Sequence, residues 1–176
     1  ESVSAHLQQL LGPQYEVFNL GVEGYSFHQI GAVALTKAQS LAPDYLIFAF
    51  IADDLLRSCI ACYGGTLRPQ FVEKDGSLEL GNIPLPVPGA ADEKSKVEKF
   101  PGYILLTSRL TRLRLLRLVT EPYYLWKKRD CVNEGNFKVA KAVAEKYPSS
   151  RVLFVNLYGE LPSRFRQRMK SLNLVD

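Results

Sequence analysis

Two short loops contain the residues whose types and spacing could support catalysis. The first spans residues 19–26 (NLGVEGYS) and places Gly24 just before a helical pattern. A glycine lets the backbone approach a ligand closely, and N–H groups at the start of a helix are good donors to a negative oxygen. Gly24 is therefore a candidate backbone donor, and Tyr25 and Ser26 in the same loop are candidate substrate-binding residues.

The second loop contains two adjacent carboxylates, Asp53 and Asp54, directly after the apolar residues 45–51. Side chains of neighbouring residues point in different directions, so this pair is not automatically a general acid and base. Asp is also a favoured helix cap, and that structural role suits Asp54 better than Asp53. We expect Asp53 at the site, with Asp54 beside it as a substrate-binding residue or as the cap.

Cofactors and metals have no clear binding pattern. The G-x-x-G at residues 21–24 lacks the further glycines of a dinucleotide fingerprint and the Lys of a phosphate loop. Cys59 and Cys62 form a C-x-x-C, which is typical of a redox pair or half a zinc site. Structural zinc needs four ligands, and Cys131 and the histidines are far away in sequence. We expect no cofactor, no metal and three ordinary, partly buried thiols.

His28 is the histidine nearest to the first loop. It stands two residues after Ser26, and residues two apart on a helix do not face each other. A Ser26–His28 dyad is therefore disfavoured, and we expect His28 to be a helix-surface or packed residue rather than a catalytic one.

The surrounding elements predict a parallel sheet that brings the two loops together. Residues 15–20 (YEVFNL) have the composition of a strand, residues 26–41 that of a helix, and residues 45–51 (YLIFAFI) are seven consecutive apolar residues. Such an apolar strand normally has both faces covered by helices. Strand, helix and strand form a βαβ unit, and ligands of open α/β sheets bind beyond the carboxyl ends of the strands. Gly24 and Asp53 lie at those ends.

The C-terminal part repeats this alternation. Residues 136–146 show a helical apolar face, residues 151–157 (RVLFVNL) a strand, residues 164–172 another helix, and residues 174–176 the start of a further strand. The predicted fold is an α/β, flavodoxin-like parallel sheet flanked by helices. We expect one domain over residues 1–176 that is truncated, because a parallel sheet does not normally end on an opening strand.

A long insertion, residues 59–135, separates the second and third predicted strands. Its first part is rich in Pro and Gly, and residues 103–128 are predicted to be helical up to Pro122. Seven basic and two acidic residues between positions 101 and 130 give this region a charge of +5, against +4 for the whole chain. Two interpretations stay open: a solvated helix packed on the sheet through its Leu side, or a membrane-surface or protein contact through residues 103–129.

The composition argues against nucleic-acid-binding and membrane-spanning proteins. The 47% apolar and 23% charged fractions are those of a globular domain. Basic and aromatic residues do not interleave as in nucleic-acid-binding proteins, so we expect no nucleic-acid partner. The sequence contains no apolar run near the ~18 residues that span a bilayer and no signal-peptide pattern at its start.

The two loops and their strands also resemble a known family, the SGNH (GDSL-type) hydrolases, in residues 15–29 (YEVFNLGVEGYSFHQ), 43–50 (PDYLIFAF) and 53–55 (DDL). In that family an N-x-G-x-x-G loop supplies an oxyanion-hole glycine, and the next strand ends in G-x-N-D. The resemblance implies that Gly24 is the oxyanion glycine, that Asp53 replaces the oxyanion Asn, and that Asp54 is the neighbouring Asp. Residues 68–88 resemble the two-stranded excursion found after the second strand.

The motifs for the nucleophile and base of this family, G-D-S and D-x-x-H, do not occur in residues 1–176. The resemblance implies a Ser and an Asp/His pair outside this chain, which alone is expected to be inactive. The implied activity is hydrolysis or O-acyl transfer on an acylated carbohydrate, lipid or small ester. An ionised Asp53 cannot donate to an oxyanion, so the alternative is a non-catalytic SGNH-like binding module. Free thiols favour the cytoplasm and the family is common in bacterial envelopes, so both compartments stay open.

Overall fold

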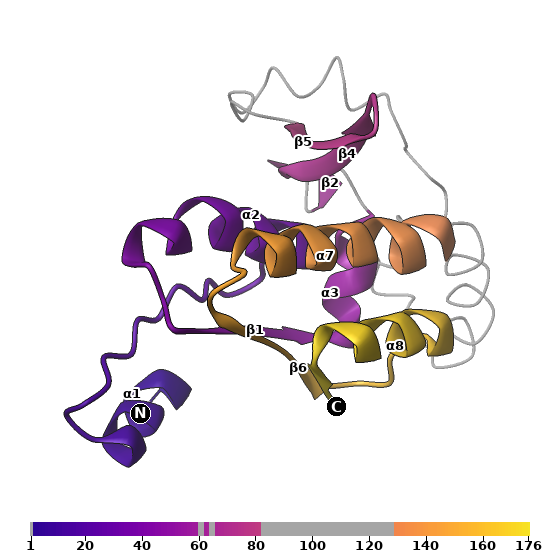
Figure 1. Cartoon of the computed structure of the whole chain (residues 1–176). Helices are drawn as coiled ribbons and strands as arrows, with labels where there is room; N and C mark the ends of the chain where they lie inside the picture. The colour runs from indigo at the N-terminus through magenta and orange to yellow at the C-terminus, as the bar shows by residue number, and fades with distance from the viewer. Residues whose placement is uncertain (1, 60–61, 64–65, 82–128) are drawn as a thin grey trace.

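The computed structural model describes residues 2–59, 62–63, 66–81 and 129–176 (Figure 1). The predicted helix over residues 103–128 and most of the insertion lie outside the described residues. No helix in the described ranges is long and apolar enough to cross a membrane. The elements follow the chain in the order α1 (Val3–Leu11), α2 (Phe27–Thr36), the 3-10 helix η1 (Ala38–Leu41), β1 (Tyr45–Ile51), α3 (Ala52–Arg57), β2 (Cys62–Tyr63), β3 (Thr66–Leu67), β4 (Gln70–Lys74), β5 (Ser77–Gly81), the π-helix η3 (Cys131–Gly135), α7 (Asn136–Lys146), β6 (Arg151–Tyr158), α8 (Ser163–Met169), the 3-10 helix η4 (Lys170–Leu172) and β7 (Leu174–Val175).

The central sheet is three-stranded and parallel, in the order β1-β6-β7. Phe48 of β1 pairs with Phe154 of β6, which in turn pairs with Leu174 of β7. The α/β class, the strands at 45–51 and 151–157, the helices at 136–146 and 164–172, and the short strand at 174–175 are therefore confirmed. The helix predicted over residues 26–41 is also present, divided into α2 and η1.

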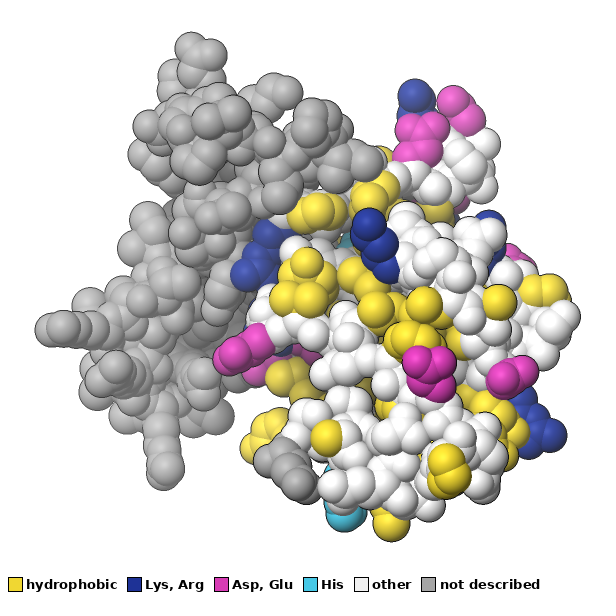
Figure 2. All heavy atoms as spheres, turned by 90° about the vertical axis from the view of Figure 1, so that its left-hand side faces the viewer, with side chains coloured by type: hydrophobic (Ala, Val, Ile, Leu, Met, Phe, Trp, Pro, Cys, Tyr) yellow, Lys and Arg dark blue, Asp and Glu magenta, His cyan; other side chains and the backbone are white. Residues whose placement is uncertain are grey.

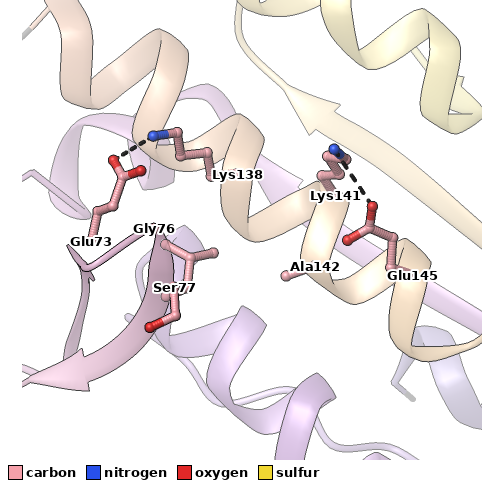
Figure 3. Close-up of a pocket in the computed structure, with 8 residues that line it drawn as sticks. Glu73, Gly76, Ser77, Lys138, Lys141, Ala142 and Glu145 are labelled. Atoms are coloured by element: carbon pink, nitrogen blue, oxygen red, sulfur yellow. Dashed lines mark hydrogen bonds and ion pairs between the residues drawn. The ribbon is translucent and has the colours of Figure 1, made fainter.

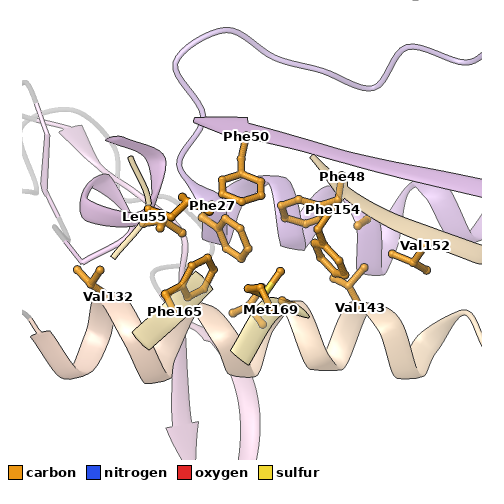
Figure 4. Close-up of a cluster of buried hydrophobic side chains, with 14 of the residues drawn as sticks. Phe27, Phe48, Phe50, Leu55, Val132, Val143, Val152, Phe154, Phe165 and Met169 are labelled. Atoms are coloured by element: carbon orange, nitrogen blue, oxygen red, sulfur yellow. The ribbon is translucent and has the colours of Figure 1, made fainter. Parts of the chain in front are cut away.

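The core is an aromatic cluster between this sheet and the helices α2, α7 and α8 (Figures 1 and 4). Phe27 of α2 lies at its centre, with ring centroids 4.8 Å from Phe48, 5.0 Å from Phe50 and 5.8 Å from Phe165. All four side chains are buried. Tilted and edge-to-face ring pairs at these distances are favourable beyond the area they bury. This cluster fixes the start of α2, and with it the end of the Gly24 loop, against β1.

The prediction that helices cover both faces of the sheet is wrong for the described residues. Alternate side chains of β1, Phe48 and Phe50, face the core, whereas Tyr45 is 48% and Ile47 50% exposed on the opposite face. The reason is that α2, α7 and α8 all pack on one face, while α1 has no buried residue and lies apart from them (Figure 1). On the side drawn in Figure 2, apolar side chains also reach the surface between charged ones.

The strand predicted at residues 15–20 is also wrong. This segment has the composition of a strand but pairs with none. No described strand lies on the outer edge of β1, so the segment has no neighbour beyond β1 with which to pair. The side chain of Gln8 binds the backbone instead. It accepts a hydrogen bond from the Val17 N–H at 2.7 Å and donates one to the Tyr15 carbonyl at 2.8 Å. A local side chain thus replaces part of a sheet ladder.

The two-stranded excursion expected within residues 68–88 is present as the antiparallel hairpin β4–β5. Asp75 and Gly76 both have positive φ values, of 51° and 79°, as the central residues of a tight hairpin turn require. The hairpin contacts α2, α3 and α7 rather than the sheet. It is therefore placed where it can influence the loops at the start of α2 and α3.

Candidate functional site

Gly24 has the backbone geometry of an exposed donor. Its φ is +77°, a left-handed value that glycine adopts without strain. A Cβ added there would meet no atom within 4 Å, so the requirement for glycine is conformational. The turn is closed by a hydrogen bond from the Tyr25 N–H to the Val22 carbonyl, 3.3 Å long. Within the described part of the chain the Gly24 N–H has no acceptor, which leaves it available to a ligand.

The next residues begin the helix α2. Ser26 is its N-cap and is buried, with its N–H donating to Gln29 Oε1 at 3.1 Å. The Ser26 hydroxyl also lies 3.2 Å from the same oxygen. These contacts give Ser26 a capping role, and contact of Ser26 or of the half-buried Tyr25 with substrate stays a prediction.

Asp53 and Asp54 have opposite surroundings, although they are neighbours. Asp54 is buried, accepts a hydrogen bond from the Ile51 N–H at 3.0 Å and pairs with Arg57 one turn later. Its predicted capping role is confirmed. Asp53 is exposed in the first turn of α3 and bonds to no other described residue. Of the two carboxylates, only Asp53 is thus free to meet a substrate.

Ser58, the residue that ends α3, connects this helix to the start of α2. Its hydroxyl accepts a hydrogen bond from the His28 N–H at 3.0 Å and donates one to the Asp54 carbonyl at 2.9 Å. The hairpin joins the same cluster, because the Gln70 amide donates to the Ser58 carbonyl. Sequence reasoning missed Ser58 and Gln70. Neither belongs to a motif, and their partners lie 30 and 12 residues away.

His28 is a packed residue, which is one of the two non-catalytic roles that the sequence predicts for it. It is buried, and Nδ1 accepts a hydrogen bond from the Phe71 N–H of β4 at 3.1 Å. Burial lowers the pKa of the imidazole to about 4, so the ring is neutral near pH 7. With Nδ1 occupied and the ring enclosed, His28 holds the hairpin to α2 and is not placed to act as a general base.

The prediction of three free thiols is wrong, because Cys59 and Cys131 form a disulfide. Cys59 follows α3, and Cys131 begins η3. Directly after η3, the buried Asn136 holds this part of the chain to α3, because its side chain donates to the Leu55 carbonyl at 3.0 Å. The C-x-x-C spacing is misleading, since the partner of Cys59 lies 72 residues away rather than at Cys62. Among the described residues, no group of three or more His, Cys, Asp and Glu side chains could hold a metal ion.

A concave region lies between the hairpin β4–β5 and α7 (Figure 3). It is an open groove of about 410 Å³. Lys138 pairs with Glu73 across it, and Lys141 lies 3.5 Å from Glu145 along α7. Because each lysine has a carboxylate partner, the groove presents no excess charge to a ligand. It is a weaker candidate than the exposed Gly24 and Asp53.

Among the described residues, the structure therefore presents a backbone donor without an acceptor at Gly24, before α2, and a carboxylate without a partner at Asp53, in the first turn of α3. Ser58 at the end of α3 bonds to the start of α2. Tyr25 and Ser26 accompany Gly24, and Asp54 supports α3. Comparisons of the chain with models of protein families, with curated proteins and with solved structures found no match.

Proposed function

We propose that residues 1–176 are the central part of an SGNH-type ester hydrolase or O-acyltransferase. Its substrate would be an acylated carbohydrate, lipid or small ester. The observation that supports this best is Gly24: an exposed N–H without a described acceptor, at positive φ, where a loop enters α2. Acyl transfer needs such a preorganised donor where negative charge develops on the carbonyl oxygen.

The free edge of β1 supports the same proposal. β1 is an apolar strand at the edge of the described sheet, and parallel strands end at the same side of a sheet. A further parallel strand on this edge would end close to Asp53. We propose that this strand lies outside residues 1–176 and carries the Ser nucleophile, and that residues 15–20 become part of the completed sheet.

In the proposed reaction the Ser hydroxyl attacks the ester carbonyl while the Asp/His pair takes its proton. The Gly24 N–H donates to the resulting oxyanion. By the resemblance, Asp53 replaces the Asn whose amide would donate a second hydrogen bond to the oxyanion. An ionised carboxylate cannot give that hydrogen bond. Removing one oxyanion donor typically costs about 10²–10³ in rate, so we expect slow turnover of simple esters.

Replacing Asp53 with Asn should accelerate ester hydrolysis in the protein that carries this chain with its flanking sequence. The amide adds the missing donor and removes a negative charge, so we expect kcat for p-nitrophenyl acetate to rise by up to about 10². Asp44→Asn is the matched control, because Asp44 is also exposed and precedes the opposite end of β1. A fall in kcat in Asp53→Asn alone would contradict this role and give the carboxylate a function of its own.

The alternative proposal is a non-catalytic SGNH-like binding module. The feature that favours it is the exposed Asp53, an acceptor for sugar hydroxyls where the family has a donor. It predicts saturable binding of an acetylated sugar, such as xylobiose carrying acetyl groups, with no hydrolysis by the natural protein. Hydrolysis by the natural protein would exclude it, whereas hydrolysis by Asp53→Asn alone would support it.

A further inference from the structure

The chain that leads into the Gly24 loop is not held by the central sheet. Residues 15–20 pair with no strand, and the bonds within the loop are local. Gly21 N–H donates to the Asn19 side chain at 3.0 Å, and Tyr25 N–H to the Val22 carbonyl. A donor that must meet a substrate oxygen needs a defined direction, so a contact from elsewhere in the fold has to supply it.

Arg68 supplies such a contact from 44 residues away. Its Nη1 donates a hydrogen bond of 3.0 Å to the Gly24 carbonyl. A guanidinium is always charged, and a hydrogen bond from a charged donor is stronger than one between neutral groups. The Gly24 carbonyl and N–H belong to the two peptide planes that meet at its Cα. While the backbone of Gly24 keeps its left-handed conformation, with φ at +77°, holding the carbonyl plane also restricts the direction of the N–H.

The segment that carries Arg68 is itself anchored to both helices. Two residues later Gln70 donates to the Ser58 carbonyl at the end of α3, and Phe71 N–H donates to Nδ1 of the buried His28 in α2. Arg68 thus extends from a base that is fixed to the two helices. Through the bond to the Gly24 carbonyl it links their position to the loop.

We infer that Arg68 is a positioning residue that orients the Gly24 N–H. This role rests on the proposed function of Gly24 in acyl transfer. Arg68 does not touch the reacting ester; it acts through the Gly24 peptide. Because an oxyanion forms only as the ester reacts, a misdirected Gly24 N–H lowers kcat more than it raises KM.

The test uses the protein with its flanking sequence, p-nitrophenyl acetate as substrate, and the variants Arg68→Met and Arg68→Lys. Met keeps much of the aliphatic stem and removes the donor. We expect kcat to fall by about 10- to 100-fold in Arg68→Met with KM within about twofold, and Lys to restore part of the loss. Lys74→Ala is the control, because it removes a cation from the hairpin that follows Arg68, and among the described residues Lys74 pairs with the exposed Glu79 alone, at 3.8 Å.

A second readout does not depend on activity. In protein labelled with 15N-glycine, the amide signal of Gly24 should shift in Arg68→Met, shift less in Arg68→Lys and stay in place in Lys74→Ala. An unchanged Gly24 signal in Arg68→Met overturns the inference, as does an unchanged kcat in an active protein. If the natural protein hydrolyses no ester, the proposed function fails, and the Gly24 signal alone decides whether Arg68 orients the loop.

Discussion

Replacing both Cys59 and Cys131 with Ala should lower the free energy of unfolding by about 4 kcal/mol. The disulfide closes a loop over a sequence separation of 72 residues, and chain-entropy estimates for a loop of this size give about 4 kcal/mol of stabilisation through the unfolded state. Urea denaturation of the natural protein with and without a reductant measures the same quantity. We expect the reduced natural protein and the double variant to unfold at similar urea concentrations.

Cys62→Ala is the matched control, because it removes the other cysteine of the C-x-x-C and leaves the Cys59–Cys131 bond intact. It should unfold like the natural protein and should still respond to reductant. Equal stability of the oxidised and reduced natural protein would contradict this account. Disulfides persist in oxidising compartments, so of the two compartments left open by the sequence we propose the cell envelope.

Lowering the pH from 7 to 4 should remove about 3 kcal/mol of stability through His28 alone. Its pKa is about 4 when folded and near the ordinary 6.5 when unfolded. The folded state therefore binds fewer protons than the unfolded state in this window, and stability falls as the pH falls below 6.5. The loss is complete near pH 4, where the folded imidazole also becomes protonated and can no longer accept from the Phe71 N–H.

The variant His28→Asn isolates this contribution. An Asn oxygen can take the place of Nδ1 as the acceptor and does not titrate. We expect urea denaturation of His28→Asn between pH 7 and pH 4 to show a smaller loss than the natural protein. His6→Asn, which changes the exposed histidine of α1, should keep the natural pH dependence. The same loss in His28→Asn as in the natural protein would show that other groups cause it.

The disulfide and His28 also show which features of the fold the sequence predicts and which it does not. The strand at 45–51, the helix at 136–146 and the strand at 151–157 follow from local apolar patterns, and each is present. Capping by Asp54 follows from its place at the start of a helix and is present, whereas the burial of His28 is one of two alternatives that the sequence left open. The Cys59–Cys131 bond depends on how α3 packs against η3, which no spacing between the cysteines encodes.

The prediction of a strand at residues 15–20 is wrong for a related reason. A strand needs a hydrogen-bonded neighbour, so its composition alone is not sufficient when no described strand takes that place. The contact between Arg68 and Gly24 likewise joins residues 44 apart. The order of the predicted elements placed Gly24 before α2 and Asp53 after β1, as the structure does, whereas the contacts that hold the Gly24 loop required the fold.

Covalent labelling with a fluorophosphonate ester tests the proposed acyl-transfer function most directly. In the protein with its flanking sequence, we predict one labelled serine, located by mass spectrometry outside residues 1–176. Gly24→Ala should slow this labelling by about 10². Gly76→Ala, which places Ala at a matching φ of +79° in the hairpin turn, should not. No labelled serine, a labelled serine within residues 1–176, or equal rates in the two variants would contradict the account.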